Sequence, residues 1–213
     1  MAYLAETSVT LTDGLALVLE RVAALHPDCD LADSGTPTAT VAVLRQRHAV
    51  LDHLVLADSP VVFEKAAGGQ AVITDLRVDD VLPELRAEVE SYQTHTPGHR
   101  AAVQRLVLTQ PQVRNTPEGH WVAGTNPEAA QHCLTGSAML RDVRSAAVLS
   151  DGVSRLVTEY GTANWDETFA ILRTDGPRGL IETVRKTEAT DPTGRRRPRY
   201  NSGDDATVAY CQW

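Results

Sequence analysis

The stretch SAAVLSDGVSRLV, residues 145–157, decides the fold of this chain. Residues 145–149 are small and branched apolar residues, which indicate a short buried strand. Asp151 and Gly152 follow at once, and the apolar residues after them recur at helical spacing. Glycine permits a tight turn beside the aspartate, so its carboxylate is expected to project from the edge of a sheet.

A second aspartate occupies a similar position near the end of the chain. Asp204 follows Gly203, and together with Asp205 it leads the run DDATVAYC, residues 204–211, which is expected to be a strand. Two such aspartates on neighbouring strands would converge on one end of a sheet. Mg²⁺ and Mn²⁺ prefer hard oxygen ligands and keep several waters, so a few carboxylates suffice to bind them. Asp151 and Asp204 are therefore candidate ligands of one such ion, although most Asp-Gly pairs are simple turns.

The remaining segments predict one α+β domain over residues 1–213, since no linker divides the chain. Four Val-rich runs between residues 38 and 75 have short connections, which favours an antiparallel meander. A polar, partly helical stretch is expected at 96–120. The expected strands are 38–44, 50–58, 61–65, 71–75, 120–124, 145–149 and 204–211, and the expected helices are 14–26, 81–95, 127–134, 164–174 and 177–189.

Composition excludes several classes of protein. No apolar run reaches the roughly 20 residues of a membrane span. The N-terminus, MAYLAETSVTLTDG, lacks the pattern of a secretory signal, which favours a cytoplasmic location. The net charge of −8 disfavours nucleic-acid binding. Three widely spaced cysteines fit neither a zinc site nor a disulfide framework, and small buried thiols are expected.

Four motifs follow one another in an informative order. They are SGTPTATVAVL (34–44), HLVLADSPVVF (53–63), SAAVLSDGVSRL (145–156) and GDDATVAY (203–210). The ordered set resembles the PP2C family of metal-dependent serine/threonine protein phosphatases, in its divergent bacterial branch, from about residue 34 to 213. The resemblance implies an αββα sandwich of two antiparallel sheets flanked by helices. It also implies Mg²⁺- or Mn²⁺-dependent hydrolysis of phosphomonoesters on serine/threonine phosphoproteins.

The resemblance assigns roles to individual residues. Asp151 matches the metal-ligand aspartate of the third motif, and Asp204 matches the ligand of the last motif. Gly152 follows Asp151, and Asp205 takes the place usually held by asparagine, so both are possible secondary site residues. Asp58 matches the aspartate of a Gly-Asp-Ser motif, whose role in the family is mainly structural. No catalytic residue beyond the metal ligands is expected.

The front of the family pattern has no counterpart here. Family members begin with strands carrying an acidic residue and an apolar-Asp-Gly motif, whose aspartate bridges two metals. Nothing before residue 34 supplies this motif, and Asp13 is interpreted as a helix-start residue. We therefore expect a domain without its first strands and with impaired activity. An unpaired sheet edge would favour homo-oligomers.

Two other interpretations remain open. A catalytically silent phosphatase-like domain could bind a regulatory protein partner, or the chain could be a structural α+β domain without a metal site. The basic run GRRRPRY, residues 194–200, is either a solvated loop or an element that attracts a phosphorylated partner.

Overall fold

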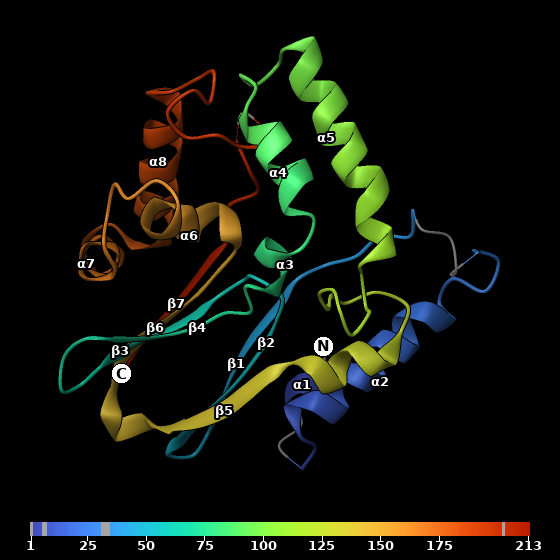
Figure 1. The fold of residues 1–213 in the computed structure, drawn as a ribbon. Coiled ribbons are helices and arrows are strands. Elements are labelled where there is room, and N and C mark those ends of the chain that lie inside the picture. The colour runs from blue at the N-terminus through green and yellow to red at the C-terminus, as the bar shows by residue number, and fades with distance from the viewer. Residues whose placement is uncertain (1, 6–7, 31–34, 202) are drawn as a thin grey trace.

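The computed structural model describes residues 2–5, 8–30, 35–201 and 203–213. Its strands form two antiparallel sheets, with the orders β1-β2-β5 and β4-β3-β6-β7. Helices lie on the outer side of each sheet (Figure 1). The strands are β1 Val41–Arg47, β2 Val50–Leu56, β3 Val61–Lys65, β4 Gln70–Ile73, β5 Leu134–Met139, β6 Val143–Leu149 and β7 Val208–Gln212.

The helices fall into an N-terminal, a central and a C-terminal group. The α-helices are α1 Ala2–Ala5, α2 Leu11–Ala24, α3 Arg77–Asp80, α4 Pro83–Glu90, α5 Pro97–Thr109, α6 Asp151–Thr158, α7 Trp165–Thr174 and α8 Gly176–Ala189. Short 3₁₀ helices cover η1 Gln110–Gln112, η2 Pro127–His132 and η3 Leu140–Asp142.

Three apolar clusters define the layers of the molecule. Leu51, Val61 and Phe63 belong to the cluster between the two sheets. A second cluster joins α2 to the outer face of the β1-β2-β5 sheet, and a third joins α6, α7 and α8 to the outer face of the other sheet. The expected αββα sandwich of two antiparallel sheets is therefore confirmed.

The expected meander is wrong at its middle connection. β1 pairs with β2 and β3 pairs with β4, both antiparallel, but the two hairpins lie in different sheets. Ala57, the residue after β2, lies in the left-handed region with φ 69°, and Pro60 lacks the N–H that would continue a ladder. β2 and β3 are buried along most of their length, so each takes a second partner from far along the chain.

Several local expectations also need correction. The expected strand 120–124 is not formed: the segment has only isolated bridges, from His120 to Arg114 and from Ala123 to Ala39. β5 was not predicted, because LTGSAM lacks a run of branched residues and is largely exposed. Cys29 and Cys211 are exposed and Cys133 is only partly buried, so the expectation of buried thiols is wrong.

The start of α2 agrees with the sequence. The Thr10 hydroxyl accepts a hydrogen bond from the backbone N–H of Asp13 at 3.0 Å, which caps the helix. Asp13 lies in the first turn, where a carboxylate is favoured by the helix dipole. It is a helix-start residue, as expected.

Candidate functional site

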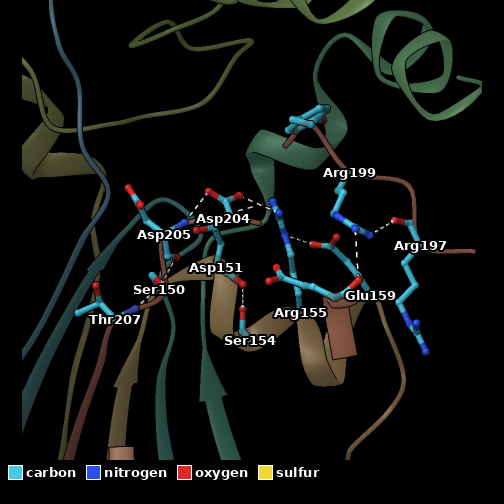
Figure 2. A network of polar contacts seen from close by, with 12 residues as sticks. Ser150, Asp151, Ser154, Arg155, Glu159, Arg197, Arg199, Asp204, Asp205 and Thr207 are labelled. Atoms are coloured by element: carbon cyan, nitrogen blue, oxygen red, sulfur yellow. Dashed lines mark hydrogen bonds and ion pairs between the residues drawn. The ribbon is translucent and has the colours of Figure 1, made fainter. Parts of the chain in front are cut away.

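Hydrogen bonds join the β6–α6 junction to the segment before β7. β6 ends at Leu149, and Asp151 is the first residue of α6. The Ser150 hydroxyl donates to the Asp205 carbonyl at 2.9 Å and accepts from the Thr207 N–H at 3.0 Å. The Ser150 N–H donates to the Thr207 carbonyl at 3.0 Å. These bonds hold Asp204 beside the start of α6 (Figure 2).

Gly152 makes this close approach possible. A Cβ at this position would lie 2.3 Å from the Asp205 carbonyl oxygen and 3.1 Å from the Asp204 Cβ. No side chain fits there without displacing the backbone of the neighbouring segment. Gly152 therefore sets the separation of Asp151 from Asp204 by having no side chain.

Arg155 lies between the two predicted ligand aspartates (Figure 2). One of its terminal nitrogens is 3.1 Å from Asp151 Oδ2, and the other is 2.7 Å from Asp204 Oδ2. Its Nε is 3.1 Å from Glu159 Oε1, and its side chain is only 10% exposed. The cation that Asp151 and Asp204 share in this structure is thus a guanidinium.

Sequence reasoning missed Arg155 and Glu159. The signal was present, because Asp151, Arg155 and Glu159 follow one another at intervals of four residues on one helix. Such residues share a face and form ion pairs. Both i,i+4 pairs are formed in α6.

Asp58 contributes to the same cleft from the connection between β2 and β3. It follows β2 and lines a cleft of about 540 Å³ together with Asp151, Arg155 and Asp204. Asp205 is not among the lining residues, and its side chain points away from Arg155 in Figure 2. The charged lining residues are Asp58, Asp79, Glu90, Asp151, Glu159 and Asp204, with Arg86, Arg155 and Arg199.

Burial and the excess of carboxylates shift the pKa values of the ionisable groups in the cleft. Burial, and then the charge of Asp151, raise the pKa of Asp58 to about 6. Burial also raises the pKa of Asp151; Arg155 opposes this rise and Asp204 adds to it. Burial acts to lower the pKa of Arg155, but Glu159, Asp151 and Asp204 together raise it above its usual value. The cleft therefore favours cations and disfavours a further negative charge.

The carboxylates of the cleft are ligands of the kind that Mg²⁺ and Mn²⁺ prefer, but their present arrangement does not fit either ion. Carboxylate oxygens are the right ligands, yet the Oδ2 atoms of Asp151 and Asp204 are both engaged by Arg155. The second oxygen of Asp204 accepts from the Asp205 N–H at 2.9 Å. Among the described residues, no group of three or more His, Cys, Asp or Glu side chains is placed to hold a metal ion.

Comparison with known proteins shows the fold. No family model and no curated protein sequence matches the chain. The serine/threonine phosphatase 2C of Toxoplasma gondii matches with a TM-score of 0.54 and 12% identity, over 94% of this chain and 65% of that chain. A bacterial serine phosphatase matches with a TM-score of 0.53 and 13% identity, over 88% of this chain and 68% of that one. The serine/threonine phosphatase Stp1 of Staphylococcus aureus matches with a TM-score of 0.50 and 14% identity, over 85% of this chain and 63% of that chain.

The chain has the PP2C-like fold, as its motifs implied, over about two thirds of the length of the phosphatases it matches. These phosphatases and this chain share two antiparallel sheets and flanking helices. No helix among the described residues is long and apolar enough to cross a membrane.

Proposed function

We propose that this chain is a phosphatase-like domain that binds a protein partner and is catalytically silent while Arg155 holds its acidic cleft. The observation that supports the proposal is the position of Arg155, paired with Asp151, Asp204 and Glu159. A divalent ion would need the same carboxylate oxygens. Its binding would also place a second cation within a few ångströms of a buried guanidinium, which is unfavourable.

A phosphate group would meet a cleft with more carboxylates than guanidinium groups. Like charges repel, and burial strengthens the repulsion. Hydrolysis of a phosphomonoester requires a barrier reduction on the order of 20 kcal/mol. Arg155 is itself committed to three carboxylates, so it has little capacity left to stabilise a transferring phosphoryl group. These features favour binding over catalysis.

A second candidate is Mg²⁺- or Mn²⁺-dependent hydrolysis of serine/threonine phosphoproteins, with impaired activity. The convergence of Asp58, Asp151 and Asp204 on one cleft favours it. Burial and then the charge of a neighbouring aspartate raise the pKa values of Asp58 and Asp151, and a divalent ion would offset both effects. In this case Arg155 would have to leave the carboxylates before the metal could bind.

The two candidates are separated by Mn²⁺ binding and turnover. We expect the wild-type chain to show no Mn²⁺-dependent hydrolysis of p-nitrophenyl phosphate above background. In calorimetry, Arg155→Met should bind Mn²⁺ at least tenfold more tightly than wild type, because the carboxylates are released. Arg178→Met is the matched control, since its ion pair with Glu182 is on the surface and its side chain is 90% exposed. Mn²⁺-dependent turnover by wild type that Asp151→Ala abolishes would favour hydrolysis instead.

A further inference from the structure

The segment that joins α8 to β7 contains a loop, residues 191–199, that is held by internal hydrogen bonds. The buried Asp191 carboxylate accepts from the backbone N–H groups of Arg195, Arg196 and Arg197 at 3.0, 2.9 and 2.8 Å. The guanidinium of Arg199, whose side chain is 1% exposed, donates to the Asp191 carbonyl at 2.5 Å. These buried contacts fix the backbone of the loop from inside.

The arginines of this loop have different roles. Arg199 is part of the interior, and Arg197 donates to the Thr190 hydroxyl at 3.2 Å and lies over the ring of Tyr160. The side chains of Arg195 and Arg196 are exposed, and the part of the chain that the structure describes offers neither an ion-pair partner. The two adjacent, exposed guanidinium groups form a local positive patch on a chain whose net charge is −8.

We propose that Arg195 and Arg196 form a docking site for an acidic, carboxylate-bearing segment of a partner protein. Each guanidinium presents a planar fork that matches one carboxylate, so two neighbouring arginines suit two acidic side chains. Loops that cradle phosphate supply successive backbone N–H groups. Here those groups point inward and are occupied by Asp191, so the loop offers a ligand guanidinium groups and not backbone N–H groups.

The loop also adjoins the phosphatase-like cleft. Pro198 and Arg199 line that cleft together with Asp58, Asp151 and Asp204. An acidic segment is attracted by the loop and repelled by the carboxylates of the adjoining cleft, so we expect it to bind at the loop and not in the cleft. The inference rests on the proposed function, because it names the partner chemistry of a domain that binds without hydrolysis.

The test is fluorescence anisotropy with labelled short peptides in EDTA, which prevents metal-dependent hydrolysis. One peptide carries glutamates, a second carries glutamines at the same positions, and a third carries phosphothreonines. We expect the glutamate peptide to bind more tightly than its glutamine twin. Arg195→Gln/Arg196→Gln should weaken its binding about tenfold. Arg195→Lys/Arg196→Lys should recover only part of this loss, because lysine lacks the fork. Arg141→Gln is the control, since that side chain is 80% exposed.

Equal binding of the glutamate and glutamine peptides would overturn the proposal. An equal loss in Arg141→Gln would do the same, because it would reduce the effect to net charge. Tighter binding of the phosphothreonine peptide would replace the carboxylate partner with a phosphorylated one. Failure here is separate from failure of the proposed function: Mn²⁺-dependent turnover tests the cleft, whereas peptide binding in EDTA tests the loop.

Discussion

Asp52 and Arg155 are the centres of two ion-pair networks of opposite composition. Asp52, on β2, is a single buried carboxylate that accepts from the guanidinium groups of Arg45 and Arg47 and from the Ser137 hydroxyl. Arg155, on α6, is a single guanidinium among the three carboxylates of Asp151, Glu159 and Asp204. Each network bridges segments that are distant in sequence.

The two networks differ in how well their carboxylates are compensated by guanidinium groups. The hydrogen bond from Arg47 lowers the pKa of Asp52 most, and Ser137 and Arg45 add to this, against the effect of burial. Around Arg155 the acids outnumber the base, and the pKa values of Asp151 and Glu159 are raised, chiefly by burial. A compensated network stabilises a sheet, whereas an uncompensated one in a cleft marks a candidate site.

The strongest test of this contrast is Asp52→Asn. The substitution removes the carboxylate charge that Arg45 and Arg47 share in this network. We expect urea denaturation to show a loss of about 3–5 kcal/mol in the free energy of unfolding. Asp142→Asn is the control, because its ion pair is 3.9 Å long and its side chain is 69% exposed, and such pairs contribute at most about 1 kcal/mol. Equal effects would remove the distinction between this network and a surface pair.

The same carboxylate gives this network a pH dependence of known sign. The folded pKa of Asp52 is below its unfolded value of about 3.9, so its stabilisation is fully present above that value. It is lost as the pH falls through the folded pKa. The stability difference between wild type and Asp52→Asn should therefore shrink when the pH is lowered from about 5 towards 2.

Arg155→Met should have the next largest effect. It leaves Asp151, Asp204 and Glu159 near one another without their shared cation, and we expect a loss of about 2–4 kcal/mol at neutral pH. Mn²⁺ should return part of this loss in a thermal melt, since ligand binding stabilises the folded state. A variant as stable as wild type, with or without Mn²⁺, would mean that the acids are not held together by Arg155.

Gly152→Ala tests the spacing of the cleft. The added Cβ would lie 2.3 Å from the Asp205 carbonyl oxygen, so the segment carrying Asp204 must move. We expect a loss of about 1–3 kcal/mol, measured by chemical denaturation. Gly124→Ala is the control, because its Cβ would meet Thr38 Cγ2 at 3.4 Å, an ordinary contact. Comparable stability of the two variants would show that the close approach is not required.

The smallest expected effect is a gain in stability from Asp58→Asn. The folded pKa of Asp58, about 6, is above the unfolded value, so its ionised form destabilises the folded state at pH 7.5. Removing the charge should stabilise the chain by about 1–2 kcal/mol at pH 7.5. The gain should vanish below about pH 4, where both states are protonated. The exposed Asp80→Asn is the control, and an unchanged or lower melting temperature for Asp58→Asn would contradict the prediction.

Local elements could be predicted from the sequence, and the order of the four motifs indicated the fold. The strand–Asp-Gly–helix junction at Asp151 and the two hairpins follow from residue type and short connections. The assignment of the hairpins to different sheets depends on distant partners, β5 and β6, which no local pattern specifies. Asp58 was expected to be mainly structural, and its place in the cleft depends on the packing of the two sheets.

The acid cleft was predicted in part. Asp151 and Asp204 lie at one site, as their positions after β6 and before β7 indicated. Arg155 was not predicted as a site residue, because its four-residue spacing from Asp151 is that of an ordinary helical ion pair and its contact with Asp204 depends on a segment far along the chain. Self-association through an exposed sheet edge stays a prediction, which sedimentation at several protein concentrations would measure.

The division of the two hairpins between sheets has a consequence for how the chain folds. The β1-β2 and β3-β4 hairpins close over a few residues, on a timescale of about 1–10 μs. Their inner strands are completed only by segments about 80 residues further on: Ser137 bonds to Asp52 across 85 positions and Ser145 to Glu64 across 81. During synthesis, therefore, β2 and β3 each keep one unpaired, apolar edge until β5 and β6 have left the ribosome. Non-local closure of this kind is slow, and refolding yield should fall as protein concentration rises.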